Sequence, residues 1–295
     1  MSCDVSALNC EAPRRVQSIK LDLSGGVTTE GRLFPSVNEG PGLLVLPAMG
    51  VNARAYDRFA EQLASFGVTT LVAEHRGGDT SSIRPKRGVD FGYAELLDDA
   101  VVHVRELQKH AKGAVSVLGH SLGGQLATVG LSRWYQPGGK LIVIAGGTVH
   151  YTAYRNKLES LGVLLGTQLA NGVARTLGYF PGHRLGFGGL QSKALIIDWA
   201  HAARTGRFTS STRGDIELEL DRHEPEVLAI HVKGDTMAPR STTEGLIQKL
   251  PKARTRWVEL EPPAQPKKMN PHFRWLKEPQ AAARHVSSFL RGETV

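Results

Sequence analysis

The stretch V-L-G-H-S-L-G-G at residues 117–124 places Ser121 between two glycines, directly after an apolar run. The apolar run predicts a strand and the residues that follow predict a helix, so the serine lies in a sharp strand-to-helix turn. The spacing G-x-S-x-G in this context is typical of a nucleophile elbow, which exposes the serine oxygen at the end of a sheet. Gly119 and Gly123 fit this interpretation because side chains at these positions would collide with the neighbouring strand and helix. The alternative is a serine that only begins the helix.

Strands and helices alternate on both sides of this turn. Continuous apolar runs at 42–49 and 140–147 are typical of strands buried on both faces, and amphipathic helices are predicted at 52–67 and 91–111. This alternation predicts a mostly parallel central sheet with right-handed crossovers and helices on both faces, an α/β fold. The other predicted elements are a hairpin at 16–35, strands at 68–75, 227–234 and 255–262, and helices at 122–135, 241–250 and 279–292.

Residues 148–224 interrupt the alternation. They are rich in Gly, Tyr, Leu and Arg and show a weak helical pattern at 153–177 and 191–204. The predicted organisation is therefore an N-terminal tail at 1–13, an α/β core at 14–147 and 225–295, and a helical insertion at 148–224. The insertion is expected to be a lid, with a packed helical layer as the alternative.

Composition and charge exclude several classes of protein. The 295 residues are 41% hydrophobic and 22% charged, as in ordinary globular proteins. The net charge of +8 is spread along the chain, whereas a nucleic-acid-binding protein would concentrate it on one face, so no nucleic-acid partner is expected. No apolar run is long enough to span a membrane. The start lacks an apolar signal core, and Cys3 and Cys10 are interpreted as reduced thiols in the tail, which favours the cytoplasm.

A serine nucleophile needs a base and an acid that orients the base. In this chain order the acid and the histidine are expected after later strands. Asp235 follows the strand predicted at 227–234, and His272 lies in the loop after the strand predicted at 255–262. We therefore predict the catalytic triad Ser121, Asp235 and His272. The alternatives are a turn aspartate and a surface histidine.

An oxyanion hole needs two backbone N–H donors. Leu122 follows the serine at the start of the helix, and Met49 lies at the end of the apolar run 42–49, where Gly50 allows close approach. We predict these two residues as the donors, with a simple tight turn at 47–50 as the alternative. His120 is expected either to line the pocket or to pack against the core.

These features resemble the α/β-hydrolase superfamily, and within it bacterial predicted hydrolases of the serine aminopeptidase and lysophospholipase-like group. The similar stretches are listed here: P-A-M-G-V at 47–51, R-G-G-D-T-S at 76–81, G-H-S-L-G-G-Q-L-A at 119–127, L-G-Y-F-P-G-H-R-L-G-F-G-G at 177–189 and P-H-F-R-W at 271–275. The chain departs from the usual pattern at Pro271, where a glycine is common, and at Ala48-Met49, where a His-Gly pair is common. The resemblance implies an α/β-hydrolase fold and a serine hydrolase.

The expected activity is hydrolysis of a carboxylic ester or thioester of a small to medium apolar acyl group. Tyr151, Tyr154 and Phe180 of the insertion are expected to line the substrate pocket with His120. Acyl transfer by the same triad, amide cleavage and a non-catalytic binding module are the alternatives. No metal or organic cofactor is implied, and the partners considered are a small-molecule substrate and a second copy in a homo-oligomer.

Overall fold

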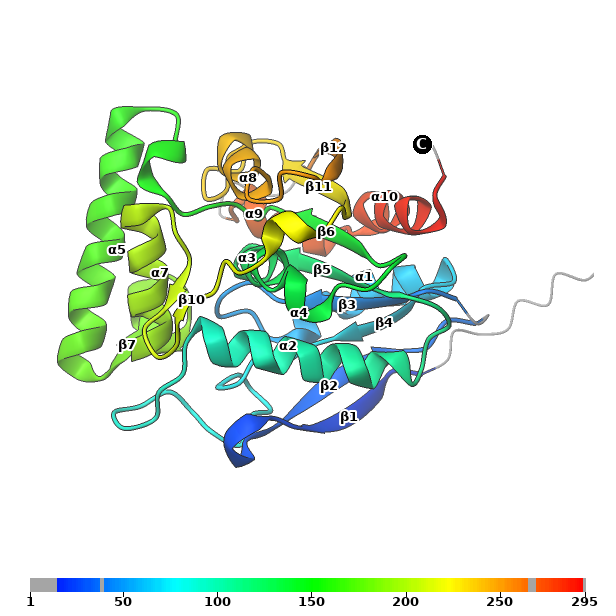
Figure 1. Ribbon diagram of the computed structural model, residues 1–295, viewed down its shortest axis with the longest axis horizontal. Helices are drawn as coiled ribbons and strands as arrows, with labels where there is room; N and C mark the ends of the chain where they lie inside the picture. Colours follow the sequence, from blue (N-terminus) through cyan, green and yellow to red (C-terminus); the bar gives the residue numbers. More distant parts are fainter. Residues whose placement is uncertain (1–14, 38–39, 265–268, 294–295) are drawn as a thin grey trace, which may run out of the picture.

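The computed structural model describes residues 15–37, 40–264 and 269–293. Cys3, Cys10 and the predicted tail at 1–13 lie outside the described residues. Figure 1 shows a central sheet with helices on both sides and a separate group of helices beyond one end of it.

The central sheet has eight strands in the order β1-β2-β4-β3-β5-β6-β11-β12. Strands β4 to β12 of this order pair in parallel, and β2 runs antiparallel to both of its neighbours. The predicted mostly parallel sheet is confirmed. The strands are β1 (Gln17–Asp22), β2 (Thr28–Phe34), β3 (Gly42–Leu46), β4 (Thr69–Val72), β5 (Val115–His120), β6 (Lys140–Ile144), β11 (Glu226–Val232) and β12 (Arg254–Leu260).

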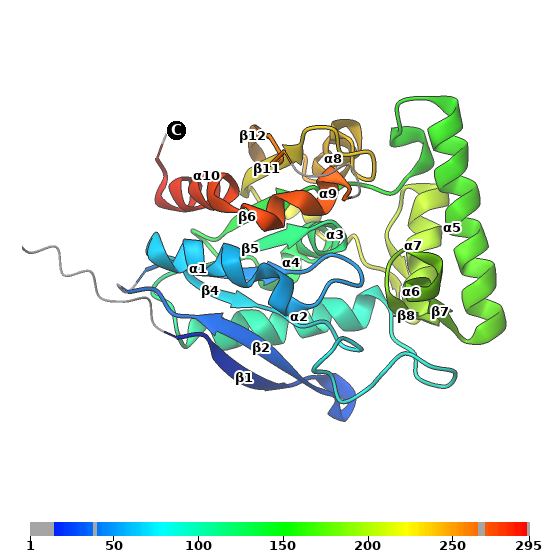
Figure 2. The same ribbon diagram turned by 180° about the vertical axis from the view of Figure 1, so that it is seen from behind.

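Helices cover both faces of the sheet (Figures 1 and 2), as the sequence predicts. The sequence of β3 is continuously apolar because the strand is buried on both faces. Leu44 and Leu46 belong to one core cluster, and Leu43 and Val45 to the other. Helices α1 (Asp57–Ser65) and α10 (Gln280–Arg291) contribute to the second cluster, and the first contains residues of α2 (Tyr93–Gln108), α3 (Leu122–Val129), α4 (Leu131–Trp134) and α8 (Arg240–Ile247).

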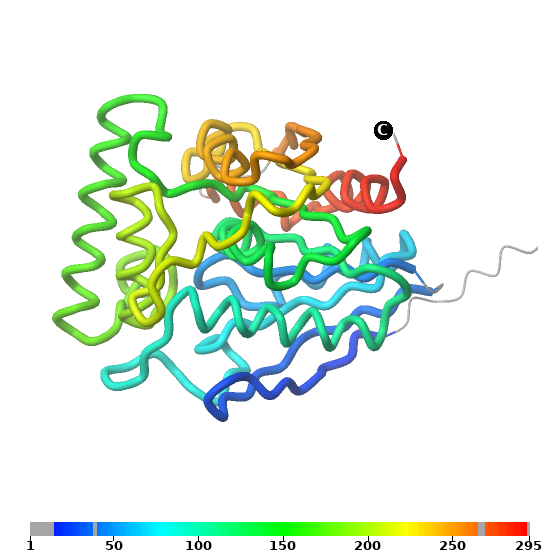
Figure 3. Tube along the Cα trace, in the orientation of Figure 1, coloured from blue at the N-terminus to red at the C-terminus, as the bar shows by residue number. Residues whose placement is uncertain are grey.

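The chain leaves this core after β6 and returns to it at β11, as the trace in Figure 3 shows. The insertion between them contains two longer helices that coincide closely with the stretches of weak helical pattern, α5 (Lys157–Leu177) and α7 (Lys193–Thr205). Its shorter elements are η3 (Tyr151–Ala153), β7 (Tyr179–Pro181), α6 (Gly182–Leu185), β8 (Leu190–Ser192), β9 (Thr209–Ser210), β10 (Gly214–Asp215) and η4 (Leu220–Arg222). Among the described helices, none has the length and apolar character needed to cross a membrane.

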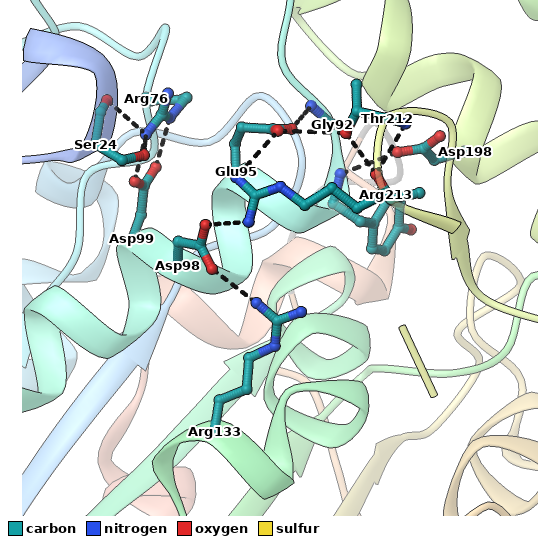
Figure 4. Close-up of polar contacts among 12 residues, drawn as sticks. Ser24, Arg76, Gly92, Glu95, Asp98, Asp99, Arg133, Asp198, Thr212 and Arg213 are labelled. Atoms are coloured by element: carbon teal, nitrogen blue, oxygen red, sulfur yellow. Dashed lines mark hydrogen bonds and ion pairs between the residues drawn. The ribbon is translucent and has the colours of Figure 1, made fainter. Parts of the chain in front are cut away.

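Polar contacts attach the insertion to the first turns of α2 (Figure 4). Asp198 of α7 is buried, and its two carboxylate oxygens accept hydrogen bonds from the backbone N–H groups of Tyr93 at 3.1 Å and Ser211 at 2.6 Å. A Cβ atom at Gly92 would lie 2.3 Å from the same carboxylate, so a side chain at this position would displace Asp198. Arg213 adds ion pairs to Asp98 and Glu95 of α2, and Arg133 pairs with Asp98 at 2.7 Å.

Asp198 is expected to make stability fall as pH rises. Burial raises its pKa to about 6, above the usual value of about 3.9. Between these two values the folded state binds more protons than the unfolded state, so the free energy of unfolding decreases by roughly 2–3 kcal/mol from this group as pH rises from about 4 to about 6. Asp198→Asn removes the titration, and urea unfolding at a series of pH values should show the variant gaining stability relative to wild type over this range. A difference that stays constant with pH would contradict the expectation.

Candidate active site

The elbow holds Ser121 in a backbone conformation that side chains rarely adopt. Its φ is 55° and its ψ is −115°, directly between β5 and α3. A Cβ atom at Gly119 would lie 2.1 Å from the carbonyl oxygen of Gly123, and one at Gly123 would lie 2.0 Å from the carbonyl oxygen of Leu46. Both glycines are therefore required by backbone-to-backbone packing, as expected for a nucleophile elbow.

Asp235 and His272 come together although they are 37 positions apart in the sequence. The Nδ1 atom of His272 lies 2.7 Å from the Oδ2 atom of Asp235, and both side chains are buried. The other carboxylate oxygen of Asp235 accepts hydrogen bonds from the backbone N–H groups of Met237 at 2.8 Å and Ala238 at 3.1 Å. The carboxylate is thus held by its own turn and can orient the imidazole.

His272 lies on a short helix, α9 (Pro271–Arg274), rather than in the predicted loop. Its N–H donates to the Oδ1 atom of Asn270 at 2.9 Å, and its carbonyl oxygen lies 3.0 Å from the Nε2 atom of His120. The Nε2 atom of His272 is buried and has no hydrogen-bond partner among the residues that the structure describes. Ser121 and His272 nevertheless line the same cavity. The hydrogen bond between a catalytic serine and its histidine is often long before substrate binds.

Met49 and Leu122 also line this cavity. Met49 lies in the loop between β3 and η2 (Ala53–Tyr56), and three buried or half-buried side chains hold that loop. The hydroxyl of Tyr56 accepts from the N–H of Ala48 at 2.8 Å, the Nε2–H of His75 donates to the carbonyl of Pro47 at 2.9 Å, and Glu74 accepts from the N–H of Ala53 at 2.8 Å. Burial lowers the pKa of His75 to about 4, so this imidazole stays neutral near pH 7.

The contacts of His120 fix which nitrogen carries its proton. The Nε2 atom faces the carbonyl of His272, which can only accept, so Nε2 carries the hydrogen. In the neutral ring Nδ1 then accepts from the hydroxyl of Tyr56, 2.8 Å away. Burial lowers the pKa of His120 well below its usual value, which keeps the ring neutral. Tyr56 and His120 therefore connect the loop that carries Met49 with the helix that carries His272.

Gly50 packs against the insertion. Its φ is 72°, and a Cβ atom there would lie 2.5 Å from the carbonyl group of Gly188 and 2.7 Å from the nitrogen of Gly189. The sequence predicts close approach at Gly50, and in the structure the approaching group is the backbone of the insertion. Gly188 and Gly189, at the end of the stretch 177–189, thus allow the insertion to pack against the loop that carries Met49.

The cavity has a volume of about 840 Å³ and lies between the core and the insertion. Of the predicted pocket residues, Tyr154 and Phe180 line it. His120 is fully buried behind the elbow and does not, in accordance with its alternative interpretation as a core residue. Tyr151 begins η3 and is not part of the cavity wall. The centroid of its ring lies 5.0 Å from that of the His150 ring.

The cavity wall carries no permanent charge. Among its described residues none is Asp, Glu, Lys or Arg, and its polar side chains include Gln125, which donates to the carbonyl of Gly147 at 2.8 Å. The sequence analysis did not identify Gln125 in the cavity wall or Tyr56 behind it. Both lie among apolar neighbours, and this pattern indicates only helix residues. Within the described ranges no three His, Cys, Asp or Glu side chains are grouped so as to hold a metal ion.

Comparisons with known proteins agree with this architecture. The sequence profile of the family described as serine aminopeptidase, S33, matches residues 42–257. None of the curated proteins matches the chain by sequence. Similar solved structures include an esterase from Exiguobacterium antarcticum, with 16% identity, 93% of this chain and 100% of that chain covered, and a TM-score of 0.61.

Two other solved structures show the same fold at low identity. A hydrolase from Pseudomonas aeruginosa is 20% identical, with 92% of this chain and 98% of that chain covered, and a TM-score of 0.56. The thioesterase domain from the curacin biosynthetic pathway is 14% identical, with 94% and 99% covered, and a TM-score of 0.57. At these identities the likeness concerns the fold.

Proposed function

The chain belongs to the serine aminopeptidase S33 family of α/β hydrolases, and from this we propose that it hydrolyses carboxylic esters or thioesters of apolar acyl groups through an acyl-enzyme. The observation that carries the proposal is the arrangement around one uncharged cavity. Ser121 and His272 line it together, and Asp235 lies 2.7 Å from His272 behind its wall. The esterase and thioesterase among the similar structures support the same reaction class.

In the proposed mechanism the Oγ atom of Ser121 attacks the acyl carbonyl carbon while its proton passes to the Nε2 atom of His272. The carboxylate of Asp235 holds the Nδ1–H of the imidazole and stabilises the cation that forms. The protonated imidazole then gives its proton to the leaving alcohol or thiol, which departs. A water molecule then attacks the acyl carbonyl carbon while its proton passes to the Nε2 atom of His272. The proton returns to the Oγ atom of Ser121 as the carboxylic acid leaves.

The backbone N–H groups of Met49 and Leu122 are proposed to hold the negative oxygen of the tetrahedral intermediate. The N–H of Leu122 lies at the beginning of α3, where the helix dipole favours negative charge. Each donor of this type contributes about 3–4 kcal/mol to the transition state. The insertion is proposed to act as a lid over the site, because α5 and Phe180 form part of the cavity wall.

The uncharged wall favours acyl groups over amino-terminal peptides. An aminopeptidase needs an acidic side chain to bind the ammonium group of its substrate, because a charge left unpaired in an apolar site is costly. None of the described wall residues is acidic. A volume of about 840 Å³ leaves room for a medium acyl chain and its leaving group, since small-molecule sites span roughly 300–1,000 Å³.

The proposal is tested with p-nitrophenyl esters of increasing chain length and the matching acyl thioesters. We expect kcat/KM to rise from acetyl to medium chains and aminoacyl-anilides to be poor substrates. A fluorophosphonate probe should label Ser121, as located by mass spectrometry. Folded protein that hydrolyses aminoacyl-anilides in preference to every ester would overturn the assignment. Products formed with an added alcohol separate acyl transfer from hydrolysis.

Tyr56→Phe is expected to lower kcat about 10- to 100-fold with KM within about twofold, since it disturbs groups that act in the transition state. The change leaves the N–H of Ala48 and the Nδ1 atom of His120 without their shared partner. Steady-state kinetics on one ester measure the effect. Tyr135→Phe, which removes a tyrosine hydroxyl outside the cavity wall, is the matched control. Equal losses in both variants, or a change in KM alone, would contradict a positioning role.

A further inference from the structure

The outer face of α5 carries a row of exposed leucines. The helix lies at the edge of the molecule in Figures 1 and 2, with α7 on its inner side. Residues 160–174 include no Asp, Glu, Lys or Arg. Spacings of three and four residues place the exposed leucines on one stripe about 16 Å long. We call this stripe the leucine face; its members and their exposed fractions are Leu158 (81%), Leu161 (50%), Leu165 (59%) and Leu169 (71%).

The leucine face adjoins the wall of the cavity. Leu169 belongs to the face and also lines the cavity. Leu185 and Phe187 line the cavity as well, and they are 61% and 37% exposed. The cavity wall therefore includes exposed apolar side chains and shares Leu169 with the leucine face, so the apolar surface continues from the cavity onto α5.

Basic side chains lie at both ends of the leucine face. Residues 155–187 contain four Lys or Arg residues and one acidic residue, Glu159. Arg87 joins the basic residues at the carboxyl end, where it donates to the carbonyl of Thr176 at 2.8 Å. The exposed basic residues include Arg155 just before α5, Lys157 at its beginning, and Arg87, Arg175 and Arg184 near its end.

We propose that the leucine face binds an anionic lipid surface and that ester substrates enter the cavity from that surface; the second part rests on the proposed hydrolysis. An apolar helix face flanked by Lys and Arg is the pattern that places a helix in the plane of a lipid interface. A second copy of the chain fits less well. Two leucine faces in contact would bring the basic ends close together, with one glutamate in each copy to offset them.

The experiment measures binding of the Ser121→Ala protein to vesicles, so that binding is read without turnover. The vesicles contain phosphatidylcholine alone or with about one third phosphatidylglycerol. We expect binding to the anionic vesicles and at least about tenfold weaker binding of Leu158→Gln/Leu161→Gln/Leu165→Gln. These three leucines do not line the cavity. The matched control is Leu218→Gln, which changes a 53% exposed leucine outside α5. Circular dichroism and the Tm verify that the variants fold.

Activity is then measured with the Ser121-containing protein on a soluble short-chain ester and on an ester carried in anionic vesicles. The triple variant should keep its rate on the soluble ester and lose at least about tenfold on the vesicle ester. Absence of vesicle binding by the parent protein, or equal binding by the triple variant, overturns the proposal. A concentration-dependent dimer that the triple variant abolishes, without vesicle binding, assigns the face to a second copy instead. Vesicle binding without hydrolysis of any ester supports the surface and contradicts the proposed function.

Discussion

Ser121→Ala is expected to lower kcat on esters by at least about 10⁴-fold with little change in KM. The methyl group keeps the shape of the elbow and the cavity, so substrate still binds, but no oxygen remains to form the acyl-enzyme. Steady-state kinetics measure the effect, and loss of fluorophosphonate labelling at this position accompanies it. The Tm should change little, because a φ of 55° strains the backbone of alanine about as much as that of serine.

Two controls separate this loss from general damage. The double variant Ser121→Ala/His272→Ala should be no slower than Ser121→Ala alone, because residues that act in one step have non-additive effects. Ser288→Ala changes a serine on α10, far along the chain from the elbow, and should keep full activity. Retention of more than a tenth of the wild-type kcat by Ser121→Ala would rule out a serine nucleophile at this position.

Gly123→Ala is expected to destabilise the protein by more than about 3 kcal/mol, which is in the range of severe core substitutions. A Cβ atom at this position would lie 2.0 Å from the carbonyl oxygen of Leu46 and 2.9 Å from that of Pro47. Both neighbours are backbone atoms of β3 and the loop after it, so no side-chain rotation can relieve the contact. Urea unfolding measures the loss, and ester hydrolysis should fall with it because α3 must move away from β3.

The matched control is Gly162→Ala on α5, where a Cβ atom would meet nothing within 4 Å. Alanine is the better helix former by about 1 kcal/mol, so this variant should keep or gain stability. A Gly123→Ala protein with the stability and activity of wild type would show that the elbow does not require close backbone packing at this position.

The sequence predicts most of the core because its signals are local. The apolar run of β3 reflects burial on both faces, and Leu43 and Leu44 indeed belong to different core clusters. The glycines around Ser121 follow from steric contact within one turn. The proximity of Asp235 and His272 is predicted because the strands that precede them end at the same edge of a parallel sheet. The structure brings the aspartate and the histidine within hydrogen-bond distance.

Other features depend on contacts between distant residues, which no local pattern records. Tyr56, His120 and the carbonyl of His272 form one hydrogen-bonded series across three separate segments. The pattern of Tyr56 indicates only a buried helical position, and that of His120 leaves open whether it faces the pocket or the core. The contact of Gly50 with Gly188 joins the core to the insertion, and the sequence does not say which backbone approaches that glycine.

The sequence by itself therefore determines the alternation of strands and helices, the turn at Ser121 and the chain order of Ser121, Asp235 and His272, because periodicity and short-range steric contact are written in neighbouring residues. Only the tertiary structure decides which hydroxyl orients His120, which residues wall the cavity, and which leucines of α5 face outward. These depend on the packing of segments far apart in the chain. A leucine in a helix has the same local pattern whether another helix covers it or leaves it exposed.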